Sequence, residues 1–175
     1  MDIENDNTSK LDIKSFSSEY DVRKITENDI TDIYKLCKDN KYFYRYLGHV
    51  ATKESLTEVI SNVAGDSENG KYFVGFYDES RLIAIADLIT GYPDSESAFI
   101  GWYVVDGNLQ RQGIGSQIFA DIRASLKSVG ISHISLGCVK ENEIAVNFWQ
   151  GQGFKPANDE KQVGRHTVVT YERKI

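Results

Sequence analysis

A glycine-rich segment between a strand-like run and a helix-like run constrains this chain more than any other feature. Apolar, β-prone residues fill 98–105, and Gln110-Arg-Gln-Gly-Ile-Gly-Ser116 follows them. An amphipathic stretch then continues to about Val129. A helix that begins in such a loop presents free backbone N–H groups at the positive end of its dipole, which favours phosphate. Gly113 and Gly115 permit a tight turn and leave no Cβ between the backbone and a pyrophosphate.

The glycine spacing separates this loop from two other phosphate loops. A P-loop requires G-x-x-x-x-G-K-[ST], and no lysine stands at the required place. A dinucleotide-binding fingerprint requires a third glycine where Ile118 stands. The pattern Q/R-x-x-G-x-G/A does fit, with Gln110 first and glycines at 113 and 115.

This pattern resembles the acetyl-CoA loop of the GNAT superfamily of N-acetyltransferases. Downstream, the segment from Asn142 to Phe154 is similar to the family's ending N-x-x-A-x-x-F-[YW]-x-x-x-G-F. The start at Val22–Asp29 is similar to the family's first strand and helix, so the resemblance covers roughly residues 20–175. It implies the α/β GNAT fold: a mixed, twisted sheet of about seven strands, helices on both faces, and a V-shaped splay at the central strands. It also implies acetyl-CoA as co-substrate.

The periodicity of the chain predicts an order of elements that agrees with this fold. Strands are predicted at Tyr20–Ile25, Lys71–Tyr77, Leu82–Ile89, 98–105, Ile134–Val139, near Phe154, and at Thr167–Arg173. Helices are predicted at 26–38, 52–63, 115–129 and 143–150. The strands on either side of the glycine loop and its helix should pair in parallel through a right-handed crossover.

The same pass along the chain divides it into two parts. Residues 1–18 are polar and without clear periodicity, so we interpret them as a flexible N-terminal arm with one short strand at Leu11–Phe16. Residues 19–175 are interpreted as a single N-acetyltransferase domain.

The first chemical requirement of acetyl transfer is to hold the coenzyme and polarise its carbonyl. In the family the strand before the loop is bulged, and its N–H and C=O groups point at the pantetheine arm and the thioester. The resemblance places these groups at Tyr103–Val105, and it places the pyrophosphate on the N–H groups of residues 111–116. The complete set of expected coenzyme-binding residues is Tyr103, Val104, Val105, Gln110, Arg111, Gln112, Gly113, Ile114, Gly115, Ser116, Asn142 and Trp149.

The second requirement is a base that removes a proton from the amine. The family often places a carboxylate on the central strands, and the candidates here are Asp87 and Glu96. Asp87 interrupts the apolar run 82–89, and burial would raise its pKa toward a useful range. The alternative for Asp87 is a structural carboxylate bound by backbone donors, and for Glu96 a solvated turn residue.

The third requirement is to stabilise the leaving thiolate. A tyrosine often stands in the family where this chain has Trp149, whose indole N–H can donate a hydrogen bond but cannot release a proton at neutral pH. Tyr103 is the candidate for a substitute acid, and simple core packing is the alternative role of Trp149. Asn142 is expected to contact the coenzyme arm and also to cap the following helix.

Three tyrosines, Tyr42, Tyr44 and Tyr46, fall where the family covers its acceptor pocket. Aromatic faces bind cationic amines through cation–π contacts, although plain hydrophobic cover for the sheet is the alternative. The net charge of −6 argues against nucleic acid and is compatible with a cationic acceptor, with a solubilising surface charge as the alternative. Nine acidic and four basic residues lie in 1–32, which leaves the remainder at −1.

The remaining composition excludes several classes of protein. No apolar run approaches a membrane span, and the acidic start lacks the features of a signal peptide, so a cytoplasmic protein is expected. Cys37 and Cys138 lie in unlike contexts, which predicts reduced thiols, with Cys138 buried and inert. The three histidines lack metal-ligand spacing, and no metal is expected.

These observations lead to one functional hypothesis and two alternatives. We expect an acetyl-CoA-dependent N-acetyltransferase that acts on the primary amine of a small molecule by direct attack in a ternary complex. The alternatives are a protein N-terminal or lysine acetyltransferase, and a non-catalytic acyl-CoA-binding module. The expected partner is the amine acceptor, with a homodimer as a further option.

Overall fold

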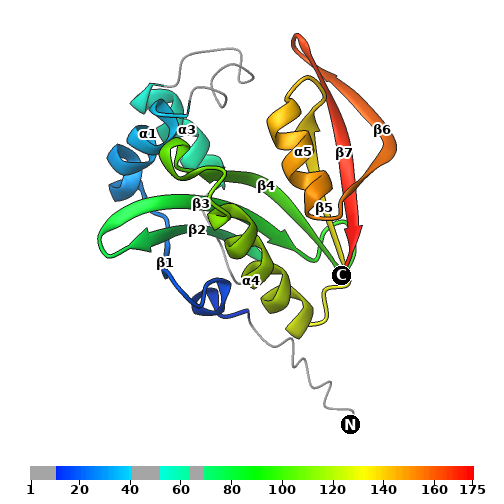
Figure 1. Cartoon of the computed structure of the whole chain (residues 1–175), viewed down its shortest axis with the longest axis horizontal. Helices are drawn as coiled ribbons and strands as arrows, with labels where there is room; N and C mark the ends of the chain where they lie inside the picture. Colours follow the sequence, from blue (N-terminus) through cyan, green and yellow to red (C-terminus); the bar gives the residue numbers. More distant parts are fainter. Residues whose placement is uncertain (1–10, 41–51, 64–68) are drawn as a thin grey trace.

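The protein forms one seven-stranded mixed sheet with helices on both faces (Figure 1). The computed structural model describes residues 11–40, 52–63 and 69–175. The strand order is β1-β2-β3-β4-β5-β7-β6. This architecture confirms the predicted GNAT fold.

The elements agree closely with the predicted ranges. The strands are β1 (Asp21–Lys24), β2 (Lys71–Asp78), β3 (Arg81–Thr90), β4 (Ser97–Val105), β5 (His133–Val139), β6 (Lys155–Val163) and β7 (His166–Lys174). The helices are α1 (Ile30–Lys38), α3 (Lys53–Val63), α4 (Ile114–Ser128) and α5 (Glu143–Gly151). Short 3-10 turns are η1 (Ile13–Phe16), η2 (Glu27–Asp29) and η4 (Gly107–Leu109).

The connections follow from local sequence signals. Strands β1 to β4 pair antiparallel in sequence order, and α4 then carries the chain over to β5, which pairs parallel with β4. Thr26 and Asp29 form a capping box ahead of α1. Gly130, with a φ of +90°, follows α4 and supplies the left-handed residue that ends it.

The sheet separates two hydrophobic clusters. Ile33, Leu36, Leu56 and Ile60 of α1 and α3 pack against one face, together with Phe73 of β2. The other face is covered by α4, α5 and η1, and its cluster includes the following buried side chains: Phe16, Phe119, Ile122, Trp149 and Phe154. Burial of two faces explains why β2 and β3 read as almost continuous apolar runs.

The segment before β1 differs from the expectation of a short strand at Leu11–Phe16. Residues 13–16 form the 3-10 turn η1, which Asp12 caps by accepting a hydrogen bond from the N–H of Lys14. Phe16 is completely buried, and the hydroxyl of Ser125 in α4 donates to the carbonyl of Ser15 at 2.6 Å. Phe16 is followed by a turn and not by residues of alternating polarity, so no strand forms here. The η1 turn instead packs against α4 through the buried Phe16 side chain.

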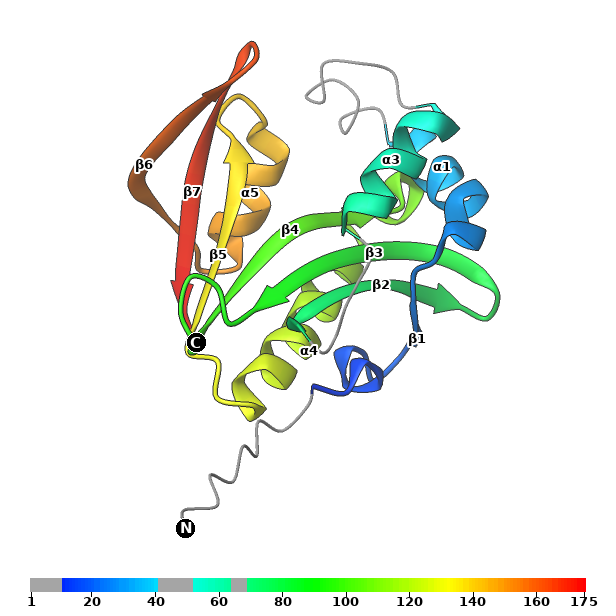
Figure 2. The same ribbon diagram turned by 180° about the vertical axis from the view of Figure 1, so that it is seen from behind.

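The sheet opens in its middle, between β4 and β5. Their pairing covers Ser97–Ile100 and His133–Leu136, and among the described residues it goes no further. On the other side of β4, the register with β3 shifts between Asp87 and Leu88, which leaves Gly101 as an extra, bulged residue. Beyond their short pairing, β4 and β5 diverge and form a V that is visible from both sides of the molecule (Figures 1 and 2).

Candidate active site

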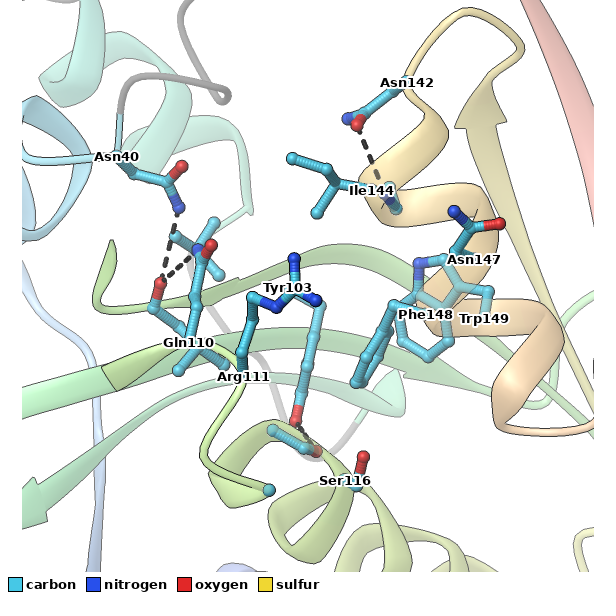
Figure 3. Close-up of a pocket in the computed structure, with 15 residues that line it drawn as sticks. Asn40, Tyr103, Gln110, Arg111, Ser116, Asn142, Ile144, Asn147, Phe148 and Trp149 are labelled. Atoms are coloured by element: carbon cyan, nitrogen blue, oxygen red, sulfur yellow. Dashed lines mark hydrogen bonds between the residues drawn. The ribbon is translucent and has the colours of Figure 1, made fainter. Parts of the chain in front are cut away.

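A cavity of about 540 Å³ lies where the two central strands separate. It is bounded by the end of β4, the glycine loop, α5 and Asn40, the second residue after α1 (Figure 3). Its lining residues are Asn40, Tyr103, Val104, Val105, Gln110, Arg111, Gly113, Gly115, Ser116, Asn142, Ile144, Ala145, Asn147, Phe148 and Trp149.

The glycine loop has the backbone that an anion site needs. Arg111 and Gly113 adopt positive φ angles of 62° and 85°, so the chain turns sharply before α4 begins. The N–H of Gln117 donates to the carbonyl of Gly113 and closes the first helical turn. The N–H groups of residues 114–116 come before the first intrahelical bond, so they point out of the positive end of the helix. With Arg111 on the cavity wall, this loop fits a phosphate group.

Gly115 is required for space as well as for shape. A Cβ at this position would lie 3.3 Å from Cγ2 of Val105 and 3.4 Å from the ring of Phe148. The hydroxyl of Tyr103 also donates to the Gly115 carbonyl at 2.6 Å. The loop therefore sits directly against the end of β4 and the α5 helix.

Along β4, only every second residue directs its backbone N–H and C=O groups toward the cavity. Val104 is paired with Ile85 of β3, and the N–H of Asp106 donates to the Ile83 carbonyl at 2.8 Å. Because the N–H and C=O of successive strand residues point to opposite sides, those of Tyr103 and Val105 face the opening. The expected backbone role therefore fits residues 103 and 105, and Val104 contributes only its place on the cavity wall.

One of these outward groups is already engaged by the protein. The Val105 carbonyl accepts hydrogen bonds from Nδ2 of Asn40 at 3.3 Å and from Nε2 of Gln110 at 3.1 Å, drawn as two dashed lines in Figure 3. Asn40 is 7 % exposed and follows α1. Within the part of the chain that the structure describes, the N–H and C=O of Tyr103 and the N–H of Val105 are therefore the strand groups that remain for a ligand.

Two of the expected site residues have structural roles in addition to lining the cavity. The Asn142 side chain accepts a hydrogen bond from the N–H of Ala145 at 3.2 Å, so it caps α5. The Tyr103 hydroxyl is held by Gly115, and burial raises its pKa above the ordinary value. A tyrosine with a raised pKa and an occupied proton is a poor general acid, which argues against this role for Tyr103.

Trp149 lies at the centre of an aromatic cluster. Its ring centroid is 4.9–5.4 Å from those of Tyr103, Phe119, Phe148 and Phe154. It is only 6 % exposed. Figure 3 shows the indole nitrogen on the side of the ring nearest Ile144 and Asn147, which both line the cavity. The residue therefore packs in the core and also presents its one donor toward the site.

Asp87 is a buried carboxylate on the face of the sheet that α1 and α3 cover. It is 5 % exposed, and it lies between Phe73 and Trp102 on the neighbouring strands, whose rings stack at 6.0 Å. It makes no hydrogen bond or ion pair within the described part of the chain, so the alternative of a carboxylate bound by backbone donors is not supported. Burial raises the pKa of Asp87 to about 6, and the charge of Lys71 opposes this shift in part.

The Asp87 carboxylate is directed at the bulge in β4. A Cβ on Gly101 would overlap its Oδ2 atom, so only glycine leaves room for the carboxylate there. Gly101 is exposed, and it is the first residue of β4 beyond the pairing with β5. Asp87 does not line the cavity. Its carboxylate lies next to Gly101, at the point where β4 begins to separate from β5.

The other candidates for the acceptor side are separated from this arrangement. Glu96 is exposed in the turn before β4, and its carbonyl accepts the N–H groups of Ser132 and His133. The nine residues of β4, at about 3.3 Å each, separate it from the cavity end of the strand. Tyr42, Tyr44 and Tyr46 lie outside the described residues. Gln112 and Ile114 do not line the cavity, although the N–H of Ile114 belongs to the first turn of α4.

Sequence reasoning missed several residues of the site. The unpredicted wall residues are Asn40, Ile144, Ala145, Asn147 and Phe148. Gly101 was also missed, although a lone glycine inside an apolar strand is a known signal of a bulge. Asn40 carries no such signal, because a polar residue after a helix is ordinary.

Metal-binding groups and membrane spans are both absent from the described ranges. The residues there contain no group of three or more His, Cys, Asp and Glu side chains placed to hold a metal ion. None of the helices within the same ranges is long and apolar enough to cross a membrane. Cys37 and Cys138 are buried free cysteines, and desolvation raises the pKa of their thiols to about 12 and about 11.

Comparison with known families identifies the class of the protein. The sequence profile described as "Acetyltransferase (GNAT) family" matches residues 29–154. The chain therefore belongs to this family, whose members use acetyl-CoA. A comparison with curated protein sequences gives no significant match.

Solved structures support the same fold. The protein is similar to an acetyltransferase from Thermus thermophilus, with a TM-score of 0.76, 20 % identity, and coverage of 89 % of this chain and 97 % of that one. It is also similar to the PaiA N-acetyltransferase from Thermoplasma acidophilum in complex with coenzyme A, with a TM-score of 0.64, 19 % identity, and coverage of 89 % and 99 %. A third similar structure is the Salmonella typhimurium acetyltransferase that modifies the N-terminal serine of ribosomal protein L7/L12; its TM-score is 0.73, its identity 16 %, and its coverage 91 % and 97 %.

Proposed function

We propose that this acetyltransferase moves the acetyl group of acetyl-CoA to the primary amine of a small molecule by direct attack in a ternary complex, with Asp87 as the base. The observation that carries the proposal is the buried Asp87 carboxylate, unpaired within the described ranges and directed at Gly101, where β4 separates from β5. A buried carboxylate without a partner costs stability, so its presence requires a reason.

The coenzyme side of the proposal rests on the fit of the loop and the strand. Bound acetyl-CoA supplies the acetyl group as a thioester. The N–H groups of residues 111–116 would hold its pyrophosphate, and the outward groups of Tyr103 and Val105 would hold the pantetheine arm. The cavity between them has polar backbone groups on the β4 side and the aromatic ring of Phe148 on the other.

On the acceptor side, the Asp87 carboxylate lies on the strand between those of two aromatic residues, Phe73 and Trp102. A primary amine is protonated at neutral pH and must lose a proton before it can attack. At pH 7 the Asp87 carboxylate, with a pKa of about 6, is mostly ionised and can accept that proton. The stacked rings of Phe73 and Trp102 add apolar and π-rich surface beside it, which suits an ammonium group.

The leaving thiolate is stabilised in this proposal without a proton donor. The indole N–H of Trp149 donates a hydrogen bond toward the sulfur, and a thiol with a pKa near ~8.5 is a tolerable leaving group at neutral pH. This arrangement favours an active enzyme over a module that only binds acyl-CoA.

A protein N-terminus is the second candidate acceptor. Its support is the similar Salmonella enzyme, which modifies an N-terminal serine. The small-molecule acceptor has support from the buried position of Asp87, because a carboxylate that is 5 % exposed, on a strand between those of Phe73 and Trp102, is more accessible to a slender amine than to a folded partner.

The test is a comparison of two carboxylate variants over a panel of amines. Asp87→Asn should lower kcat by at least tenfold and leave the affinity for acetyl-CoA unchanged, because a base acts on the amine rather than on the coenzyme. A large loss of kcat in Glu96→Gln alone would transfer the role to Glu96. If polyamines, amino sugars and amino acids all fail as acceptors while a peptide N-terminus is acetylated, the small-molecule assignment is wrong and the second candidate is correct.

A further inference from the structure

The hydroxyl of Ser116 has a hydrogen-bond partner that fixes its direction. Gln152, the residue directly after α5, donates from Nε2 to Oγ of Ser116 at 2.8 Å. Ser116 belongs to the first turn of α4 and lines the cavity, whereas Gln152 does not. The contact therefore joins the end of one helix to the beginning of another behind the cavity wall.

This bond determines what the hydroxyl can do. A serine oxygen that accepts a hydrogen bond from an amide must direct its own hydrogen elsewhere. Within the described ranges the Ser116 hydroxyl donates no hydrogen bond of its own. Figure 3 shows Ser116 at the foot of the cavity with its hydroxyl on the cavity side. The Ser116 O–H is thus directed to the same side of the loop as the N–H groups in the first turn of α4, which have no partner among the described residues.

Gln152 is itself held in position by two elements. Its backbone N–H donates to the carbonyls of Phe148 and Trp149 at 3.0 and 3.1 Å, in the last turn of α5. Its carbonyl accepts a hydrogen bond from the guanidinium of Arg173 in β7. The next residue, Gly153, has a φ of +83°, and a Cβ there would lie 3.3 Å from Cζ of Arg173. The side chain of Gln152 therefore starts from a fixed backbone.

We infer that Gln152 is a positioning residue for the pyrophosphate of the coenzyme: it fixes the Ser116 hydroxyl as a donor toward the phosphate. The inference rests on the proposed placement of the pyrophosphate on the loop before α4. A pre-oriented donor loses less entropy on binding than a freely rotating hydroxyl, so Gln152 should strengthen binding without touching the ligand.

Replacement by glutamate would reverse the direction of the bond. A carboxylate has no donor, so in Gln152→Glu the Ser116 hydroxyl would donate to residue 152 and be lost to the phosphate. The same change adds a negative charge beside an anionic ligand. Gln152→Met keeps the length of the side chain and only removes the donor. The two variants therefore separate loss of orientation from reversal with added charge.

The experiment measures coenzyme A affinity by calorimetry and pantetheine affinity by NMR titration. We expect Gln152→Met to raise the Kd for coenzyme A by about 3- to 10-fold, and Gln152→Glu by more than about 10-fold. Pantetheine lacks the pyrophosphate, so its Kd should not change. The matched control is Gln150→Glu, which adds the same charge to an exposed residue of the same helix and should change the Kd for coenzyme A by less than about twofold.

A double-mutant experiment with Ser116→Ala tests whether Gln152 acts on coenzyme A affinity through the Ser116 hydroxyl. In a Ser116→Ala protein, Gln152→Met should produce no further loss of coenzyme A affinity, because the group that Gln152 orients is gone. An equal loss in both backgrounds, or an equal loss for pantetheine, would overturn the inference. Gly113→Asp reports on the loop separately: if it leaves coenzyme A affinity unchanged, the pyrophosphate placement itself is wrong.

Discussion

The side-chain amide of Asn40, just after α1, donates to the backbone carbonyl of Val105, at the end of β4. This bond ties the helical cover of one sheet face to the strand that forms the cavity wall. The backbones of Asp39 and Gly107 also approach closely, because a Cβ built on Gly107 would lie only 2.9 Å from the Asp39 carbonyl oxygen. The end of α1 and the turn after β4 are therefore in direct contact.

Removal of this amide should weaken coenzyme binding. Asn40→Ala removes a side chain from the cavity wall and one of the two hydrogen bonds that hold Val105, whose N–H is a proposed contact of the coenzyme, so we expect a rise of about 3- to 10-fold in the KM for acetyl-CoA with a smaller change in kcat. Steady-state kinetics with the acceptor at saturation provides the measurement. A fall in kcat at constant KM would show instead that Asn40 acts on the acceptor.

The glycine loop should not tolerate an acidic residue. Gly113→Asp places a carboxylate at the positive end of α4 in a backbone with a φ of +85°, where a side chain is strained. A Kd for acetyl-CoA at least ~10-fold higher, equivalent to about 1.4 kcal/mol, is expected from calorimetry. Gly113→Ala, which brings the strain without the charge, serves as the control. Unchanged affinity in a folded Gly113→Asp protein would contradict the phosphate assignment.

Asp87 should make both activity and stability depend on pH. Its pKa is raised to about 6 in the folded protein from an ordinary value of 3.8. The folded state therefore binds more protons than the unfolded state between these values, so the Asp87 contribution to stability is present below about pH 4 and is lost as the pH rises through about 6. Asp87→Asn should gain about 3 kcal/mol relative to the wild type between about pH 3.5 and about pH 7.5, as measured by urea unfolding.

The same carboxylate should set the acidic limb of the activity profile. Below about pH 6 the wild-type kcat/KM should fall about tenfold per pH unit, because the base becomes protonated. Asp87→Asn should lack this limb. If the variant keeps a limb with the same midpoint, another group in the site is the base.

Trp149 should contribute to turnover through its N–H. Trp149→Phe keeps an aromatic ring in the cluster and removes the donor, so kcat should fall by about 10-fold or more if the hydrogen bond to the thiolate is worth ~1.5–3 kcal/mol. Trp149→Tyr, the residue common in the family, is the informative comparison, because it can donate a proton. An unchanged rate in Trp149→Phe would reduce the role of Trp149 to packing.

Phe16 should be as important to folding as any residue of the sheet. Its side chain is fully buried against the face that carries α4. Phe16→Ala should lower the free energy of unfolding by about 3–5 kcal/mol, as measured by chemical denaturation. Tyr92→Ala offers a contrast, because Tyr92 is 57 % exposed. A loss of less than about 1 kcal/mol for Phe16→Ala would show that η1 adds little to the fold.

The sequence was informative wherever one local signal settles the structure. The glycine loop and its helix were predicted because Gln110, Gly113 and Gly115 have a specific spacing. The buried position of Asp87 followed from the apolar run around it. Asn40 and Gln152 could not be found in this way, because each acts on a residue that is distant in the sequence and each has an ordinary local context. The fate of Phe16 was misjudged for a related reason: the polar residues around it conceal a single apolar anchor.

The separation of β4 from β5 has a consequence for the solubility of the protein. Within the described residues, β4 and β5 do not pair with each other beyond Ile100 and Leu136, so the sheet has edges in its interior as well as at β1 and β6. Of the backbone groups on this inner edge of β4, the Val105 carbonyl is bound by Asn40 and Gln110. Such an edge is a template on which a strand from another chain can assemble. A coenzyme arm bound there would occupy the same hydrogen-bonding groups. The co-substrate would then protect the enzyme against aggregation while it serves the reaction, and the protein would be safest to concentrate and store with coenzyme A present.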